Sequence, residues 1–383
     1  MPYARSLKNH GDSMSEYQYY EWQTIDRPLN PDERKSVASL SSHMDTVTST
    51  QAAVSYSWGD FKHDPRQVLL QYFDAHLYLA NWGTRRLMFR FPKSAIDPDA
   101  IQPYCREDFL TLELEGNFIT LEFALDEEEP GDEWLEATGD LGELIPIREQ
   151  ILQRDYRALY LIWLKAVSSE DPDEDNLETE PPIPAGLGKL NSSHQAFIEF
   201  FDLDEHLVKA AAKASPELQP TSTVPLEKAL LQLTRKECVT FLRQVLNNEP
   251  QVRMALQRRL EELAGSKPAK VEHGQRQVGS IFEEAGRMEQ EDLRRRKTEA
   301  EQKRIQKLLD LAEREETTWN LVESLLEKKQ AKPYDEATQL LINLRDLAIY
   351  QKRLLKFQER FLVIKEKYRS RPTLLERFRR AGL

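Results

Sequence analysis

The residue types best suited to chemistry gather in the first quarter of the chain. The stretch 72–91 reads YFDAHLYLANWGTRRLMFRF, and a nearby motif, WGDF, covers residues 58–61. An imidazole exchanges protons near neutral pH, a carboxylate can orient it, and a guanidinium can bind an anion. One hypothesis is therefore an enzyme site built around His76, Asp60 and Arg85, which requires a concave pocket that gathers all three.

The spacing around His76 favours a structural role instead. Apolar side chains recur at helical spacing and predict a helix of about four turns that starts at Asp64-Pro65 and ends at Gly83. On such a helix Asp74 and His76 point about 200° apart, so they cannot form a dyad with each other. His76 falls on the apolar stripe, which predicts a buried histidine.

The segment from Asn81 to Arg86 has two interpretations. An amide, a tryptophan and two arginines at a helix end can act as a structural cap, since arginine offsets the negative end of the helix dipole. Tryptophan and arginine are also enriched in binding hot spots. The motif at residues 58–61 has the same ambiguity and could lie near it in space. The candidate binding residues are Trp58, Asp60, Phe61, His76, Asn81, Trp82, Arg85 and Arg86.

Motifs of common catalytic and cofactor sites are absent from the sequence. There is no Walker A loop, GxSxG, dinucleotide glycine fingerprint or HExxH. Cys105 and Cys238 cannot make a zinc site alone and are predicted to be reduced thiols. A zinc site from His63, His76 and a distant acid has no spacing signature. The acidic run DEEEPGDE lacks the EF-hand order and is predicted to be a solvated loop. We assign no catalytic residue, no metal and no cofactor.

Charge is distributed unevenly along the 383 residues. Residues 1–190 hold 17 Lys and Arg against 35 Asp and Glu, whereas residues 191–383 hold 36 against 30. The last 33 residues are strongly basic, with 11 basic and 3 acidic side chains. Such a tail can bind phosphates, or it can satisfy helix ends and aid solubility. The candidate nucleic-acid-binding residues are Arg369, Arg371, Arg377, Arg379 and Arg380.

Hydrophobic patterns predict an N-terminal α+β domain with a mixed or antiparallel sheet. The hairpin has the clearest local pattern, with Leu110, Leu112 and Leu114 predicted to face the core with Ile119, Leu121 and Phe123. The expected elements are strands at 17–26, 46–58 and 86–91, a hairpin at 109–125, and helices at 31–40, from 65 onward and at 147–167.

Beyond residue 167 the pattern becomes helical. An acidic, proline-rich stretch at 168–190 is predicted to be an exposed linker. An all-α region follows, with antiparallel helix pairs over 191–265 and a long charged helix plus helical hairpins over 281–383. The long helix could also form a coiled-coil dimer. Residues 1–16 are expected to be loose and the α+β domain to cover 17–167. No apolar run is long enough to span a bilayer, and the N-terminus lacks a secretory signal.

Two regions resemble known bacterial proteins. The strings WNLVESLLEKKQAKPYDEATQLLINLRDLA (319–348) and KFQERFLVIKEKYRSRPTLLERFRRAGL (356–383) resemble the C-terminal helical region of SWIM zinc-finger proteins. The strings YEWQTIDRPL, YSWGDF and YFDAHLYLANWGTRRLMFR resemble a family of uncharacterised bacterial proteins with this architecture. The CxC…CxH zinc ligands of a SWIM finger are missing, so its zinc function is not carried over. The resemblance implies a cytoplasmic bacterial accessory protein.

These observations lead to an expectation about function. We expect a non-enzymatic cytoplasmic interaction or scaffold protein, an accessory subunit of a bacterial complex that binds other proteins and no membrane. The alternative is a nucleic-acid-associated factor that uses the basic C-terminal tail.

Overall fold

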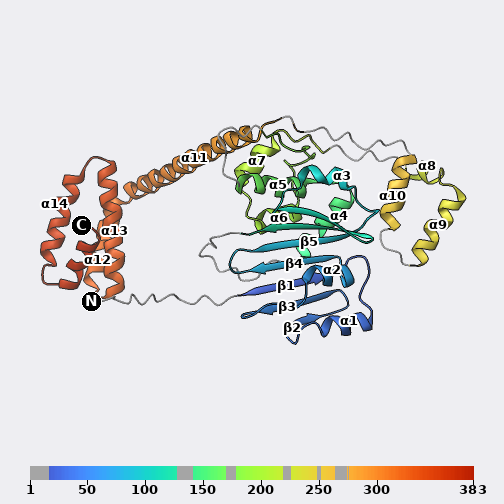
Figure 1. Ribbon diagram of the computed structural model, residues 1–383. Coiled ribbons are helices and arrows are strands. Elements are labelled where there is room, and N and C mark those ends of the chain that lie inside the picture. Colours follow the sequence, from blue (N-terminus) through green and yellow to red (C-terminus); the bar gives the residue numbers. More distant parts are fainter. Residues whose placement is uncertain are drawn as a thin grey trace, which may run out of the picture. The chain divides into compact units, whose positions relative to one another are not determined.

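The computed structural model describes residues 17–126, 141–169, 178–218, 226–247, 252–263, 274 and 276–383. The chain divides into two compact units, residues 1–288 and 289–383. The predicted fold class is confirmed, because an antiparallel sheet with helices comes first and an all-helical region with a long charged helix follows (Figure 1). The expected loose segment 1–16 and most of the acidic run DEEEPGDE lie outside the described residues.

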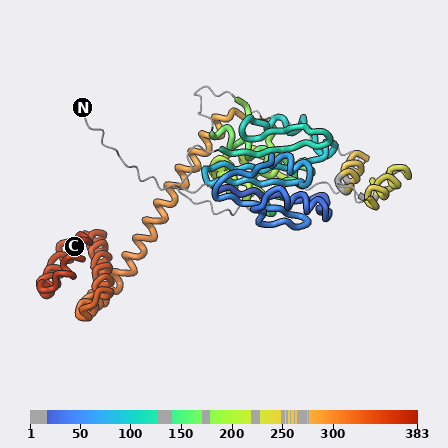
Figure 2. The backbone as a smooth tube through the Cα atoms, turned by 60° about the horizontal axis from the view of Figure 1, so that its bottom comes forward, coloured from blue at the N-terminus to red at the C-terminus, as the bar shows by residue number. Residues whose placement is uncertain are grey.

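The first unit is built on a seven-stranded antiparallel sheet. Its strand order is β2-β3-β1-β4-β5-β7-β6, so β1 and β4 lie in the middle although they are distant in sequence. Figure 2 shows these strands, blue to teal, side by side in one layer. The strands are β1 (Gln18–Gln23), β2 (Met44–Val47), β3 (Gln51–Tyr56), β4 (Ala75–Ala80), β5 (Arg85–Pro92), β6 (Leu110–Glu115) and β7 (Phe118–Leu125).

One face of the sheet is covered by α1 (Pro31–Ala38) and α2 (Pro65–Tyr72). Both helices start as the sequence predicts. Asn30 and Glu33 form a capping box on α1, and Asp64 caps α2 directly before its proline. The core of this face is aromatic, with Tyr20, Trp22, Phe61 and Phe73 packed together.

The opposite face holds the larger core. It packs the inward side chains of β4, β5 and β7 against a layer of helices, and the first turns of α11 (Val278–Glu313) join it through Val278, Ile281 and Ala285. The short 3-10 turn η1 (Gln102–Tyr104) also belongs to this layer. The helices are α3 (Pro98–Ile101), α4 (Leu141–Leu152), α5 (Arg157–Ser169), α6 (Ser192–Phe200) and α7 (Glu205–Ala212).

The predicted four-turn helix after Pro65 is wrong. The helix ends at Tyr72, and residues 75–80 form the central strand β4. Almost every side chain of β4 is buried because both faces of the sheet are covered. A strand buried on both faces loses its polar–apolar alternation, and its apolar run cannot be told from a buried helix by periodicity.

Two other elements differ from expectation. The strand predicted at 46–58 is the β2–β3 hairpin, and the helix at 147–167 is two helices that break near Arg154, whose φ is 63°. The predicted β6–β7 hairpin is confirmed. However, Leu114 is 53% exposed because it lies on the edge strand β6, next to the hairpin turn.

The prediction of an exposed linker is wrong for residues 178–190. Thr179 pairs with Gln277 as an isolated bridge, and Glu180 to Pro182 are buried. Glu180 accepts hydrogen bonds from Tyr160 and Arg276. The helices α6 and α7 therefore share one core with the sheet, and do not form a domain apart from it. Residues 170–177 lie outside the described residues.

Three further helices form a group of their own in the first unit, drawn yellow in Figures 1 and 2. They are α8 (Leu226–Leu230), α9 (Arg235–Leu246) and α10 (Val252–Leu263). Thr234 caps α9, with Glu237 completing a capping box. The guanidinium of Arg258 in α10 donates to the carbonyl oxygens of Ser94, Ala95 and Leu152.

The second unit is a small helical bundle with its own core. The expected long charged helix ends before Arg314, and α12 begins directly after that residue. Trp319, Phe357, Phe361 and Phe378 pack at the centre of the bundle. Its helices are the C-terminal part of α11, α12 (Glu315–Glu327), α13 (Ala331–Tyr350), α14 (Leu354–Lys367) and α15 (Pro372–Arg380).

Candidate functional site

His76 is a core residue of β4. Its side chain is fully buried and its ring stacks on Trp22 with 4.7 Å between centroids. Nδ1 donates to the backbone oxygen of Glu21 at 2.9 Å, which leaves Nε2 as the unprotonated nitrogen. Burial lowers the pKa of His76 to about 3, so the ring stays neutral near pH 7. The prediction of a buried histidine is confirmed, although its element is a strand.

The hypothetical enzyme site is not assembled. Asp60 is bonded to Gln18, and His76 lies opposite Trp22, so about 13 Å of β1 separates the two positions. Arg85 pairs with Leu79 and therefore lies on the opposite face of the sheet from His76. The three side chains share no pocket.

The two tryptophan motifs do meet at one end of the sheet. The amide of Gln18 donates to Asp60 Oδ1 at 2.7 Å, which fixes the loop after β3. The neighbouring Tyr17 forms two hydrogen bonds with Asn81 after β4: Tyr17 N donates to the side-chain Oδ1 of Asn81 at 2.9 Å, and Asn81 N donates to Tyr17 O at 3.0 Å. Since β1 starts where β3 and β4 end, both loops are held by adjacent residues at the start of this strand, Tyr17 just before it and Gln18 as its first residue.

The turn that carries Trp82 connects two strands. Asn81, Trp82 and Gly83 join β4 to β5, so the predicted helix C-cap is wrong for the same reason as the predicted helix. Gly83 has a φ of 99°, which favours glycine at this turn. The indole Nε1 of Trp82 donates to Thr84 Oγ1 at 3.1 Å.

Two of the candidate side chains at this sheet end are open to solvent. Trp58 is 67% exposed and Trp82 is 37% exposed, whereas Phe61 is buried in the aromatic core. Arg85 and Arg86 instead make contacts within the fold. Arg85 donates to the backbone oxygen of Phe200 at 2.8 Å, and Arg86 pairs with Glu122 and Asp126 at 2.9 and 2.8 Å. The exposed tryptophans remain the part of the predicted spot available to a partner.

A buried ionic network was missed by the sequence analysis. Asp74 accepts from Arg90 at 2.6 Å and from the backbone of Ile25 and Asp26 at 2.7 and 2.9 Å. Arg148 forms a bidentate pair with Asp26 at 2.9 and 3.1 Å. Burial raises the pKa of Asp74, but the charges of Arg148 and Arg90 and the backbone donors outweigh it, so the pKa is lowered. Every group is satisfied, which makes the network structural. An arginine in the apolar stripe of α4 was its sequence signal.

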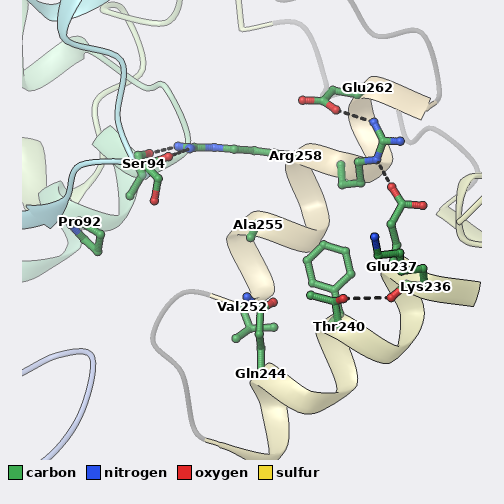
Figure 3. A pocket seen from close by; sticks show the side chains of 13 residues that line it. Pro92, Ser94, Lys236, Glu237, Thr240, Gln244, Val252, Ala255, Arg258 and Glu262 are labelled. Atoms are coloured by element: carbon green, nitrogen blue, oxygen red, sulfur yellow. Dashed lines mark hydrogen bonds and ion pairs between the residues drawn. The ribbon is translucent and has the colours of Figure 1, made fainter. Parts of the chain in front are cut away.

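A cavity lies beside α9 and α10. It measures about 770 Å³ and is bounded by the loop after β5. Figure 3 shows Arg258 reaching across it to Ser94, and Glu237 pointing toward α10, where it pairs with Arg259 at 2.7 Å. Of its charged side chains, Glu237, Arg258, Arg259 and Glu262 are engaged with each other or with the backbone. The arrangement is a groove between helices without a nucleophile and base in contact.

Metal and thiol chemistry find no support in the described part of the chain. No group of three or more His, Cys, Asp or Glu side chains there is placed to hold a metal ion. Cys105 and Cys238 are free, and burial raises the pKa of Cys105 to about 11. A thiol of that pKa is a poor nucleophile near neutral pH.

The basic tail is folded into the second unit. Arg371 donates to Tyr334 Oη at 3.1 Å and stacks on Tyr368 at 4.5 Å, and Arg377 pairs with Asp335 at 2.6 Å. Arg369 and Arg380 pair with nearby glutamates, while Arg379 is exposed. Two of the five predicted phosphate-binding arginines, Arg371 and Arg377, therefore connect helices of the bundle.

No described helix combines the length and apolarity needed to cross a membrane. Comparisons of the chain with protein-family models, with curated proteins and with solved structures found no match. Function is therefore argued from the surfaces of the molecule itself.

Proposed function

We propose that the chain is a non-enzymatic interaction protein, a cytoplasmic accessory subunit of a bacterial complex, and that a basic partner binds the end of the sheet at Trp58 and Trp82. One observation carries the proposal: two exposed tryptophans lie on loops that Tyr17 and Gln18, at the start of β1, hold in place. Side chains fixed before binding lose little conformational entropy on binding, and tryptophan is among the residues most enriched in hot spots.

Charge indicates the kind of partner. Residues 1–288 hold 30 Lys and Arg against 48 Asp and Glu, a net charge of −18. A basic protein segment would be drawn to this unit, and its lysine or arginine side chains could stack on the exposed indoles. The suggested function is thus to recruit a basic partner through an aromatic spot.

Site-specific photocrosslinking tests this proposal. A photoreactive amino acid is placed at position 58, at position 82, or at the exposed control position Leu114, and products formed in a bacterial extract are identified by mass spectrometry. We expect positions 58 and 82 to capture one basic protein that position 114 does not. The purified partner should bind the Trp58→Ala/Trp82→Ala variant about 30-fold more weakly than the wild type. Equal capture at all three positions would rule out the site.

The nucleic-acid alternative rests on a different observation. Residues 289–383 hold 23 Lys and Arg against 17 Asp and Glu, a net charge of +6. Deleting the tail is a poor test because Leu374 and Phe378 belong to the core of the bundle. Replacing Arg369, Arg379 and Arg380 by glutamine keeps that core. If the alternative holds, the affinity for a DNA duplex falls steeply as the salt concentration rises, and this dependence on salt is weaker in the glutamine variant. Binding that is absent or independent of salt excludes the alternative.

A further inference from the structure

The helix α9 has an apolar face that nothing in the described part of the chain covers. Val239, Leu242, Val245 and Leu246 are between 48% and 82% exposed, and no residue of the helix is buried. At 100° per residue they lie in one stripe with the half-buried Cys238 and Phe241. A stripe of this kind on a soluble protein marks an interaction surface.

The orientation of this face is fixed by the opposite side of α9. Glu237 closes the capping box with Thr234 and pairs with Arg259 of α10, while Phe241 and Gln244 line the groove toward α10 (Figure 3). These contacts attach α9 along one edge only. The stripe from Val239 to Leu246 consequently points away from α10, and it is about 10 Å long.

Cations lie along one edge of the stripe and at its N-terminal end. Arg235, Lys236 and Arg243 are exposed, and none of them forms an ion pair with a residue that the structure describes. Lys236 and Arg243 are seven residues apart and flank Val239, so their charges lie beside the apolar row. On the groove side, the acid Glu237 is already neutralised by Arg259. The free rim of the stripe is therefore basic.

We propose that α9 binds an acidic amphipathic helix of a partner protein. Apolar side chains of that helix would cover Val239, Leu242, Val245 and Leu246, and its carboxylates would face Arg235, Lys236 and Arg243. The length of the stripe fits two to three turns of partner helix. A second copy of α9 fits worse, because it would bring the same cations to the interface and like charges repel.

The surface differs from the tryptophan spot in both place and charge. The end of the sheet at Trp58 belongs to an acidic part of the chain, whereas the exposed rim of α9 is basic. The inference therefore extends the proposed function by a second partner of opposite charge, and each binding site can be tested without the other.

The test uses the full-length chain and three labelled peptides of 14 residues. The first has leucines at i, i+3, i+4 and i+7 with glutamates elsewhere, the second replaces every glutamate by lysine, and the third scrambles the first. Fluorescence anisotropy should show the acidic amphipathic peptide binding at least about 10-fold more tightly than the other two. Equal binding of the acidic and scrambled peptides would mean that charge alone acts, which overturns the proposal.

Variants assign the binding to α9. Leu242→Asp/Leu246→Asp should weaken binding of the acidic peptide by about 30-fold. The melting temperature of the protein should stay unchanged, because neither side chain is buried. Leu355→Asp on α14, a similarly exposed leucine, is the matched control and should leave binding unchanged. Arg235→Glu/Lys236→Glu/Arg243→Glu should reverse the preference toward the lysine peptide. Trp58→Ala/Trp82→Ala should not affect binding of the acidic peptide.

Two results would contradict the assignment. Binding that survives the aspartate variants places the peptide elsewhere. A dimer in sedimentation analysis that Leu242→Asp dissociates means that a second copy covers the stripe, and the acidic-partner proposal is then wrong.

Discussion

His76 couples the stability of the sheet to pH. Its folded pKa of about 3 lies below the value of about 6.5 for an unfolded chain. As the pH falls below 6.5 the unfolded state takes up a proton that the native state excludes, so stability decreases until the pH reaches about 3. The contribution of His76 is thus present at neutral pH and lost in acid.

Replacing His76 by Phe should remove this contribution. The ring can still stack on Trp22, so we expect a change of about 1 kcal/mol at pH 7 from the lost bond to Glu21. Between pH 6.5 and 4.5 the variant should lose about 2 kcal/mol less than the wild type in urea unfolding. The exposed His63→Gln is the control. Burial lowers the pKa of His194 to about 4, but this residue is present in both wild type and His76→Phe, so its effect on stability cancels in the comparison. Parallel pH curves for wild type and His76→Phe would contradict the assignment.

Asp74 differs from His76 because it is charged in the core, whereas the buried imidazole is neutral. Asp74→Asn removes the charge that Arg90 and Arg148 face and turns an amide toward the backbone donors of Ile25 and Asp26. We expect the free energy of unfolding to fall by about 3–5 kcal/mol in denaturant titrations at pH 7. Glu107→Gln, at an exposed carboxylate, should change it by less than about 0.5 kcal/mol. An equally small effect for Asp74→Asn would mean that the network adds nothing to stability.

At the scale of elements, local signals in the sequence were reliable and long-range ones were not. The caps at Asn30, Asp64 and Thr234 were predictable because each depends on residues within one turn. That residues 75–80 form the strand β4 was not predictable, because their conformation depends on pairing with β1 and β5 on either side. Of the candidate site, the burial of His76 and the two tryptophan motifs could be recognised from the sequence. The position of β1 between β3 and β4, which brings the two motifs to one end of the sheet, could not be predicted.

The segment 178–182 shows the same dependence on distant partners. Its acidic composition predicts a linker, yet the carboxylate of Glu180 is fully buried between Arg276 and Tyr160. Arg276 also donates to the backbone oxygens of Ala210 and Ala211 at the end of α7. One guanidinium therefore connects this segment, α7 and the start of α11.

Arg276→Met should break these contacts and leave the buried charge of Glu180 without its partner. We expect a loss of about 3–5 kcal/mol, with faster hydrogen exchange at 178–182 and at the first turn of α11. Adding Glu180→Gln should recover part of the loss, because both charges are then absent. Lys209→Met, which breaks an exposed pair with Glu205, is the control and should cost under 1 kcal/mol, the usual limit for surface pairs. Unchanged exchange at 178–182 would contradict the role of Arg276.

At the scale of the whole molecule, the two units differ in charge and have separate cores. The sheet unit is strongly acidic and the helical bundle is basic, so different partners suit each. The aromatic residues of the bundle pack only among residues of the bundle in the part of the chain described. Separate cores predict separate unfolding transitions, since cooperativity requires shared contacts.

Calorimetry of the full chain should therefore show two heat-absorption transitions. Phe361→Ala removes a ring from the core of the bundle and should destabilise one transition by about 3–5 kcal/mol while leaving the other in place. Phe123→Ala in the sheet core should have the converse effect, which makes each variant the control for the other. If either substitution lowers both transitions together, the units unfold as one body. A partner bound at Trp58 would then also stabilise the basic bundle, whereas independent units limit its effect to the sheet.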